Sequence, residues 1–361
     1  MTNMVTGWLR RHFSDPQVVI LAGLLIFGIV AVLFAGQHLV PVIASAIVAY
    51  LLEGIIQPLQ RVGVPRMPAV LIVFTIFFLV MLALLFGLLP LLTRQATQLL
   101  QEVPAMLSEG QRLILTLPEH YPNVFGEAEI ESVLNQIRRE AGGFADSMLR
   151  QTLSSVVGII TLVVYVVLMP LLVFFFLKDK NVIIGWMRRY LPRERGLATI
   201  VWQGVDTKLG NFIRGKFWEI LTVWGITYLT FVFMGLNFSM LLGFLVGISV
   251  LVPYIGAAFM TFPVALVAYF QFGWTGDLAW TLVAYGIIQI LDGNLLVPLL
   301  FAEVINLHPI AIIVAVLFFG GIWGFWGVFF AIPLAILFQG VLNAWPRKDK
   351  AAATDEDAAT F

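Results

Sequence analysis

The sequence predicts an all-α, polytopic integral membrane protein with about eight transmembrane segments. Sixty per cent of the 361 residues are hydrophobic, only 12% are charged, and the mean hydropathy is +0.96. A water-soluble domain is nearer half apolar and a quarter charged, so this chain has too little polar surface to cover itself in water. Its apolar runs reach about 20 residues, the length of helix that crosses the hydrocarbon core of a bilayer.

The same composition excludes several classes of protein. Basic and acidic residues number 21 each, which argues against a nucleic-acid partner because such a partner calls for a basic excess. There is no cysteine for disulfides, thiolate metal sites or nucleophiles, and the four histidines show no zinc-binding spacing. No serine-hydrolase turn, no protease-like pair of membrane aspartates and no P-loop is present. We therefore predict that the chain is not an enzyme and has no metal site.

Eight apolar segments follow one another along the chain. The first begins after Asp15 and Pro16, which suit the N-cap and first turn of a helix. Its apolar run is longer than that of a secretory signal and no cleavage site is present, so we interpret it as an uncleaved first span. The segments cover residues 18–36, 39–56, 69–92, 156–177, 217–235, 240–272, 278–301 and 309–341.

Charged loops predict the orientation of these spans. The stretch 178–216 contains nine basic and three acidic residues, and the stretch 93–150 contains five basic and eight acidic ones. The positive-inside rule then places the basic stretch and both termini in the cytoplasm and the acidic stretch outside. Three further basic clusters agree if each segment crosses once: Arg10 and Arg11, Arg61 and Arg66, and Arg347, Lys348 and Lys350.

Four regions are therefore expected. Residues 1–92 hold transmembrane helices 1–3, and residues 93–152 form an extracytoplasmic amphipathic helical segment. Such helices lie on the membrane or pack on one another; alternatively, they join subunits or cap a pathway. Residues 153–346 form a C-terminal membrane region with the basic helical loop 178–216 on its cytoplasmic side. The tail 347–361 is predicted to be disordered.

Asp292 is the ionisable residue that most needs an explanation, because a charge at mid-membrane costs a few kcal/mol or more. Gly293 and Asn294 follow it, and Pro298 cannot donate a hydrogen bond to the carbonyl of Asn294. The helix is therefore expected to kink or break near 292–298, as in the ion and substrate sites of transporters. The alternative is a buried kink in which Asp292 only caps the second half-helix.

A second break is expected near Pro253 and Gly256, inside the apolar stretch 240–272. Two interrupted segments in one half of a chain indicate a transport site. Glu303, Asn306 and His308 lie close by, with Asn306 or His308 as a helix cap and His308 alternatively as a proton relay. We interpret the more peripheral ionisable residues as interfacial: His38, Glu53, Glu219 and Asp277.

Small residues near the C-terminus predict close helix packing, either inside one subunit or between subunits. Their spacing lets two helix backbones approach. They are Gly320, Gly321, Gly324 and Gly327.

With these residues in view, the chain resembles the PerM-type permeases of the autoinducer-2 exporter-like (AI-2E) transporter family over nearly its whole length. Three stretches together carry the resemblance specifically: 291–298 (LDGNLLVP), 306–309 (NLHP) and the longest, 319–333 (FGGIWGFWGVFFAIP). Shorter ones are 10–16 (RRHFSDP), 176–180 (FLKDK), 212–216 (FIRGK) and 251–257 (LVPYIGA). The resemblance implies a bacterial inner-membrane permease with about eight spans and broken hairpins in its C-terminal half. It also implies a cyclic homo-oligomer, for which a pentamer is one candidate.

The leading functional hypothesis is a secondary transporter that exports a small polar solute, with Na+ or H+ as the coupling ion. A sodium (or other cation)/proton antiporter is the alternative within transport, since family members have been associated with both activities. A passive channel is a third possibility, which differs from a transporter only in needing a continuous pore. The alternative hypothesis from another class of function is a non-transporting membrane scaffold whose segment 93–150 binds another protein. Polar groups at mid-membrane favour transport.

Overall fold

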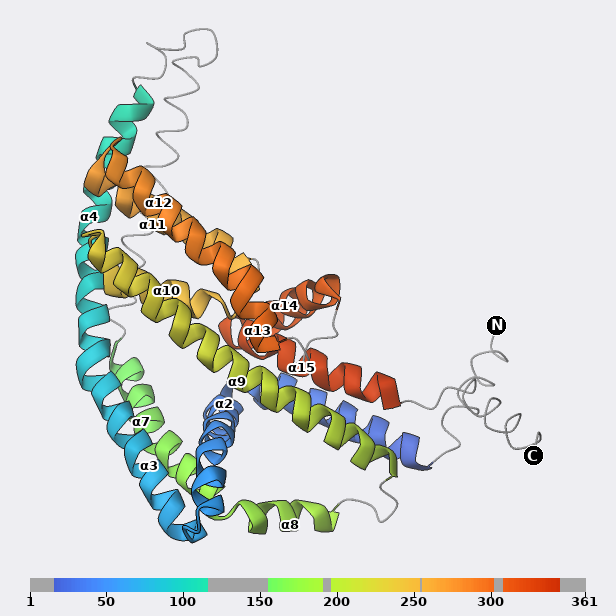
Figure 1. Ribbon diagram of the computed structural model, residues 1–361. Helices are drawn as coiled ribbons and strands as arrows, with labels where there is room; N and C mark the ends of the chain where they lie inside the picture. The colour runs from blue at the N-terminus through green and yellow to red at the C-terminus, as the bar shows by residue number, and fades with distance from the viewer. Residues whose placement is uncertain (1–15, 116–154, 191–195, 254, 302–307, 345–361) are drawn as a thin grey trace, which may run out of the picture.

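The structure is a computed structural model that describes residues 16–115, 155–190, 196–253, 255–301 and 308–344. The regular elements in these ranges are all helices, as the sequence predicts (Figure 1). Within them, four helical stretches are long and apolar enough to cross a membrane: Leu39–Arg61, Arg66–Arg112, Ile255–Phe272 and Gly276–Phe301. The eight crossings stay a prediction.

The N-terminal part differs from the prediction in its connections. Helix α2 (Pro16–Arg61) is one 46-residue helix, where two separate segments were expected. It runs through Gln37 and His38, because polar residues of this kind lower helix propensity only slightly and do not break a backbone. A proline inside a helix, such as Pro41 here, removes one hydrogen bond and can kink the helix without ending it.

The next helix is also longer than expected. Helix α3 (Arg66–Ala83), the π-helical turn η1 (Leu84–Leu88) and α4 (Leu89–Leu115) follow one another without a gap. The helical stretch therefore continues through residue 92, where the third apolar segment was expected to end, and α4 passes through Pro104. The remainder of the amphipathic segment 93–152 and the tail 347–361 lie outside the described residues.

A first apolar cluster joins the helices of the N-terminal half. Helices α2, α3 and α7 (Ser155–Lys178) pack together through buried residues that include Ile56, Val70 and Leu177. The short helix α8 (Lys180–Tyr190) follows α7 almost at once.

Helix α9 (Gly196–Phe233) is the central element, since it contacts α2, α10, α12, α13 and α15. The sequence analysis ended the basic loop at residue 216 and began a span at 217. The structure instead carries one helix through this boundary, which brings Lys216 into the buried part of the molecule.

The C-terminal half is built from hairpins that lie against α9. Helices α10 (Ser239–Ser249) and α11 (Ile255–Phe272) form the first. Helices α14 (Pro309–Trp323) and α15 (Phe325–Ala344) form the second, which splits the predicted segment 309–341 in two. Figure 1 shows both hairpins folding back on themselves.

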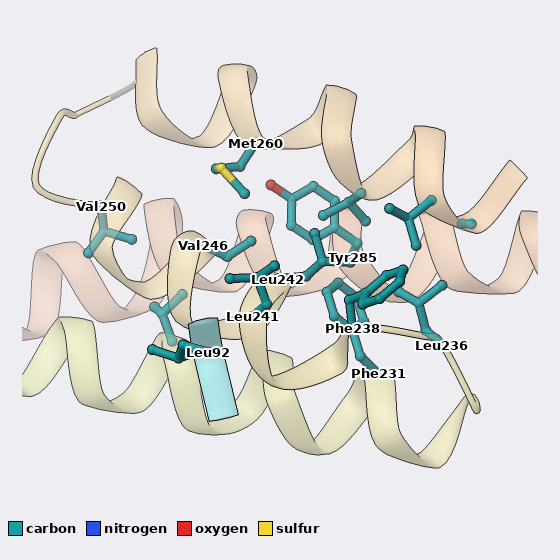
Figure 2. Packing of buried hydrophobic residues seen from close by; sticks show 14 of the residues in the cluster. Leu92, Phe231, Leu236, Phe238, Leu241, Leu242, Val246, Val250, Met260 and Tyr285 are labelled. Carbon is teal, nitrogen blue, oxygen red and sulfur yellow. The ribbon is translucent and has the colours of Figure 1, made fainter. Parts of the chain in front are cut away.

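Between the hairpins, α12 (Gly276–Leu291), the π-helical turn η2 (Asp292–Leu296) and α13 (Val297–Phe301) make one continuous stretch. The largest apolar cluster lies where α9, α10, α11 and α12 meet. Figure 2 shows Leu242, Val246, Met260 and Tyr285 within it. This core fixes the positions of the two irregular segments, 250–253 and 292–296.

Candidate functional site

The first irregular segment is the tight turn of the α10–α11 hairpin. Helix α10 ends at Ser249, and α11 begins at Ile255. A Cβ atom at Gly256 would overlap the carbonyl oxygen of Ser249, so only glycine allows the two helices to meet this closely. Pro253 lies in the turn itself. The backbone of the α10 end, including the carbonyl of Val250, is therefore held at a defined place beside α9.

The second irregular segment is the π-helical turn at Asp292. The N–H of Val297 donates to the carbonyl oxygen of Asp292, five residues back. One extra residue per turn accommodates Pro298 without ending the helix, so the expected break is a local widening in a helix that continues to Phe301. Turns of this kind are frequent at functional sites because they redirect side chains.

Three charged side chains are buried where these two segments approach α9. The exposed fractions are 7% for Lys216, 1% for Glu219 and 8% for Asp292. Lys216 Nζ lies 2.6 Å from Glu219 Oε2 and donates to the carbonyl oxygen of Val250 at 2.8 Å. Its ammonium group also lies 5.1 Å from the centre of the Phe301 ring, a cation–π contact that covers it from α13. One lysine thus joins α9, the end of α10 and α13.

Asp292 is the incomplete member of this charged cluster. It interacts electrostatically with Lys216 and Glu219. Its Oδ1 atom is buried and accepts no hydrogen bond from any described residue. When all three groups are ionised, the cluster holds one positive and two negative charges. A buried excess of negative charge favours a bound cation or proton.

The other predicted site residues do not join this cluster. Asn294 is exposed, and its Nδ2 donates to the carbonyl oxygen of Ile290 at 2.9 Å. Gly293 and Pro298 are exposed as well. His308 caps α14, where its Nδ1 accepts from the N–H of Ile310 at 3.3 Å. Glu303 and Asn306 lie outside the described residues.

Sequence reasoning missed Lys216 and misplaced Glu219. Lys216 was counted with the cytoplasmic loop, and Glu219 was interpreted as interfacial. The signal that could have found them is their i, i+3 spacing at the edge of an apolar run, which allows a lysine and a glutamate to pair on one helix face. Asp277, also interpreted as interfacial, is exposed in the first turn of α12.

Glu53 likewise turns out to be buried and paired. It is 7% exposed, and its Oε1 lies 3.2 Å from Arg66 Nη1 and 3.1 Å from Lys180 Nζ. Arg66 also donates to the carbonyl oxygen of Leu177 at 2.8 Å. This second ion network connects α2, α3, α7 and α8.

The glycines near the C-terminus form the α14–α15 hairpin. Gly324 has a φ of 59° at the turn, in the region that favours glycine. A Cβ atom at Gly327 would overlap the backbone of Phe319, and one at Gly320 would press on the side chain of Val328. Gly321 has open space beside it.

A cavity of about 480 Å³ lies far along the hairpin from the charged cluster. It is bounded by α4 and by the ends of α10 and α11 that lie away from the 250–253 turn. The lining combines polar and apolar side chains, among them Glu102, Glu109, Asn237, Phe238 and Gln271. Its volume is within the range of small-molecule sites.

Comparison with known proteins gives consistent matches over the whole chain. The family model described as AI-2E family transporter matches residues 22–347, which include the charged cluster. A protein of Escherichia coli (strain K12) named as the permease PerM is 45% identical over 347 residues, 96% of this chain and 98% of its own. The transport protein YrrI of Bacillus subtilis (strain 168) is 26% identical over 297 residues, covering 81% and 82%. The AI-2 transport protein TqsA of E. coli (strain K12) is 24% identical over 329 residues, covering 91% and 92%.

Proposed function

Because the chain belongs to the AI-2E family of transporters, we propose that it is a secondary transporter that exports a small polar solute by using a proton or sodium gradient. The observation that carries the coupling step is the buried cluster Lys216, Glu219 and Asp292, which has one more carboxylate than it has cations. A second positive charge, H+ or Na+, would neutralise it.

The chemistry of the cluster suits a hard monovalent cation. Carboxylate oxygens are ligands for such ions, and Asp292 Oδ1 accepts no hydrogen bond from a described residue. An unbalanced charge costs a few kcal/mol or more at mid-membrane, so the empty cluster is the high-energy form. Loading by an ion from the side with the higher concentration then drives the cycle.

Lys216 is the element that converts ion binding into movement. With a cation at Asp292, the lysine is balanced by Glu219 and holds the carbonyl of Val250 at the end of α10. When the cation leaves, Asp292 competes for the same ammonium group. The bond to Val250 weakens, and the end of α10 at the 250–253 turn becomes freer to move against α9. The ion thus controls how firmly this turn of the hairpin is held.

The cavity between α4 and the α10–α11 hairpin is the proposed place for the solute. Carboxylates from α4, together with amides and apolar residues such as Phe238 from the hairpin side, suit a small hydroxylated or cationic molecule. Because hairpin residues line the cavity, movement of the hairpin would open and close it. Autoinducer-2 belongs in the panel of candidate solutes, since a relative is named for its transport.

The location and the assembly follow from the same proposal. We place the protein in the bacterial inner membrane with both termini in the cytoplasm, on the basis of its loop charges. A ring of identical subunits, with a pentamer as one candidate, is the proposed assembly, because membrane oligomers of one chain type are usually cyclic. Mass measurement in lipid nanodiscs would decide it.

The test is flux in proteoliposomes with and without imposed proton and sodium gradients. We expect Asp292→Asn to insert and assemble normally but to lose gradient-driven flux, because the substitution keeps size and removes the charge. The matched control is Asp277→Asn, the same change at an exposed carboxylate of the same helix, which should transport at the wild-type rate.

The outcomes separate the candidate functions. Wild-type flux in Asp292→Asn across pH would remove the cluster from the coupling step. Exchange of sodium for protons without any solute from the panel would identify the antiporter. If neither solute nor ions move in the wild-type protein, the scaffold hypothesis takes its place.

A further inference from the structure

A buried threonine hydroxyl of α9 departs from the usual geometry of threonine in a helix. In a helix, a threonine normally donates to the carbonyl four residues back. Thr281 does so to Asp277 at 2.8 Å, and Thr261 does so to Ala257 at 2.9 Å. Thr227 of α9 is fully buried, yet its Oγ1 makes no hydrogen bond with any described residue. This hydroxyl is therefore not paired with the carbonyl four residues back in its own helix.

Packing and one ring pair indicate the register of α9 against α12. Helix α9 contacts both α12 and the turn η2 that contains Asp292, and the rings of Phe231 and Tyr285 lie 6.3 Å apart between their centres. The residue number rises along α9 while it falls along α12, so the two helices are antiparallel, as Figure 1 shows. The seam between them thus runs from the charged cluster to the Phe231–Tyr285 pair.

Thr227 and Gln289 occupy the same stretch of this seam. Thr227 lies on α9 between Glu219 and Phe231, and Gln289 lies on α12 between Tyr285 and Asp292. Gln289 Nε2 is buried and makes no hydrogen bond of full geometry with a described residue, although the Gln289 amide interacts with the Tyr285 hydroxyl. With Asp292 Oδ1, the seam contains a buried donor, a buried hydroxyl and a buried acceptor, none of which has a hydrogen bond of full geometry.

Such groups are costly unless something else satisfies them. A buried polar group without a partner costs about 1–3 kcal/mol, and in hydrocarbon no surrounding water compensates for it. Buried water molecules typically make about three hydrogen bonds to otherwise unsatisfied groups of this kind. One buried polar group without a hydrogen-bond partner can be tolerated. Several such groups along one interface between two helices indicate that the same set of bound molecules satisfies them.

We propose that a file of water molecules occupies the α9–α12 seam from Thr227 past Gln289 to Asp292. The file gives small monovalent cations a hydrated route to the charged cluster. The role of the cation rests on the proposed function, but the presence of water does not. The route approaches the cluster from the Phe231–Tyr285 end of the seam.

The absence of cysteine allows a direct test with silver ion, a thiol-binding monovalent cation. Thr227→Cys and Thr281→Cys are compared, since both threonines are fully buried and only the second has a satisfied hydroxyl. Each variant in lipid vesicles is exposed to Ag+, washed and denatured, and its free thiol is then counted with a maleimide. The cysteine-free parent gives the background.

We expect Ag+ to protect Thr227→Cys at concentrations at least about tenfold lower than Thr281→Cys, because the reacting thiolate forms only where water is present. Equal protection of the two variants would show that the Thr227 position is no more hydrated than a buried threonine with a satisfied hydroxyl, and would overturn the proposal. This result does not depend on transport. If the wild-type protein has no gradient-driven flux, the proposed function fails while the silver test still decides the seam.

A second arm uses substitutions that keep the shape of the side chain. Thr227→Val replaces the hydroxyl by a methyl group, and Thr227→Ser keeps the hydroxyl. We expect flux to fall in the valine variant and to persist in the serine variant, with unfolding temperatures that show both to be folded. If Thr227→Val raises the unfolding temperature and leaves flux unchanged, the buried hydroxyl has no water bound to it and the proposal is wrong.

Discussion

Lys216 and Glu219 form a buried ion pair one turn apart on α9, with Nζ and Oε2 separated by 2.6 Å. Removing one partner of a buried pair leaves an uncompensated charge, which costs more than the pair contributes. The lysine here has a second role, because it also holds the end of α10 through Val250. Stability and transport should therefore respond differently to substitutions of this pair.

Lys216→Met is expected to lower the free energy of unfolding by about 3–5 kcal/mol, because it leaves two buried carboxylates without a cation. The double variant Lys216→Met with Glu219→Met should recover part of that loss, since apolar residues of similar volume replace the pair while Asp292 stays without a cation. Both variants should lack gradient-driven flux. Unfolding in mild detergent, followed by tryptophan fluorescence, measures the first effect. A double variant as unstable as the single one would contradict the pairing.

Two glycines that looked alike as hinges in the sequence should behave in opposite ways. Gly256→Ala would force a Cβ into the carbonyl of Ser249, and such overpacking costs about 1–3 kcal/mol or more. Gly293→Ala meets open space, and alanine favours a helix by about 0.5–1 kcal/mol, so it should be neutral or stabilising. Unfolding temperatures of the two variants decide the matter. Equal tolerance of both would mean that the hairpin turn is looser than the structure shows.

The ion network at Glu53 should contribute more than an exposed pair. Glu53→Gln is expected to destabilise by about 2 kcal/mol, because Arg66 and Lys180 lose their shared carboxylate in a partly buried place. The control is Glu109→Gln, whose pair with Arg112 is exposed and should change stability by less than about 1 kcal/mol. Chemical denaturation of the two variants would measure the difference. Similar small losses would show that the network does not hold α8 to the bundle.

The orientation inferred from loop charges can be checked by labelling. Single cysteines at Ser132, which lies outside the described residues, and at Gly196 should react from opposite sides of the membrane. An impermeant reagent applied to intact spheroplasts should label only the Ser132 position. Labelling of both positions from the outside would reverse the orientation or change the number of crossings.

The sequence by itself determined the class of the protein. Long apolar runs with few charges permit only helices in a bilayer, because every backbone donor and acceptor must be satisfied within the segment. The same reasoning singled out Asp292 and the turn at Pro253, since a charge and a proline in an apolar run are visible as local exceptions.

Only the tertiary structure decided what these exceptions meet. Helix α9 continues across the boundary that composition suggested, because a lysine ends an apolar run without ending a helix. Lys216 then reaches Glu219 on its own helix and Val250 on another. Contacts of this second kind join residues far apart in the chain, and local pattern carries no information on them. The unpaired hydroxyl of Thr227 is likewise visible only once the packing around it is known.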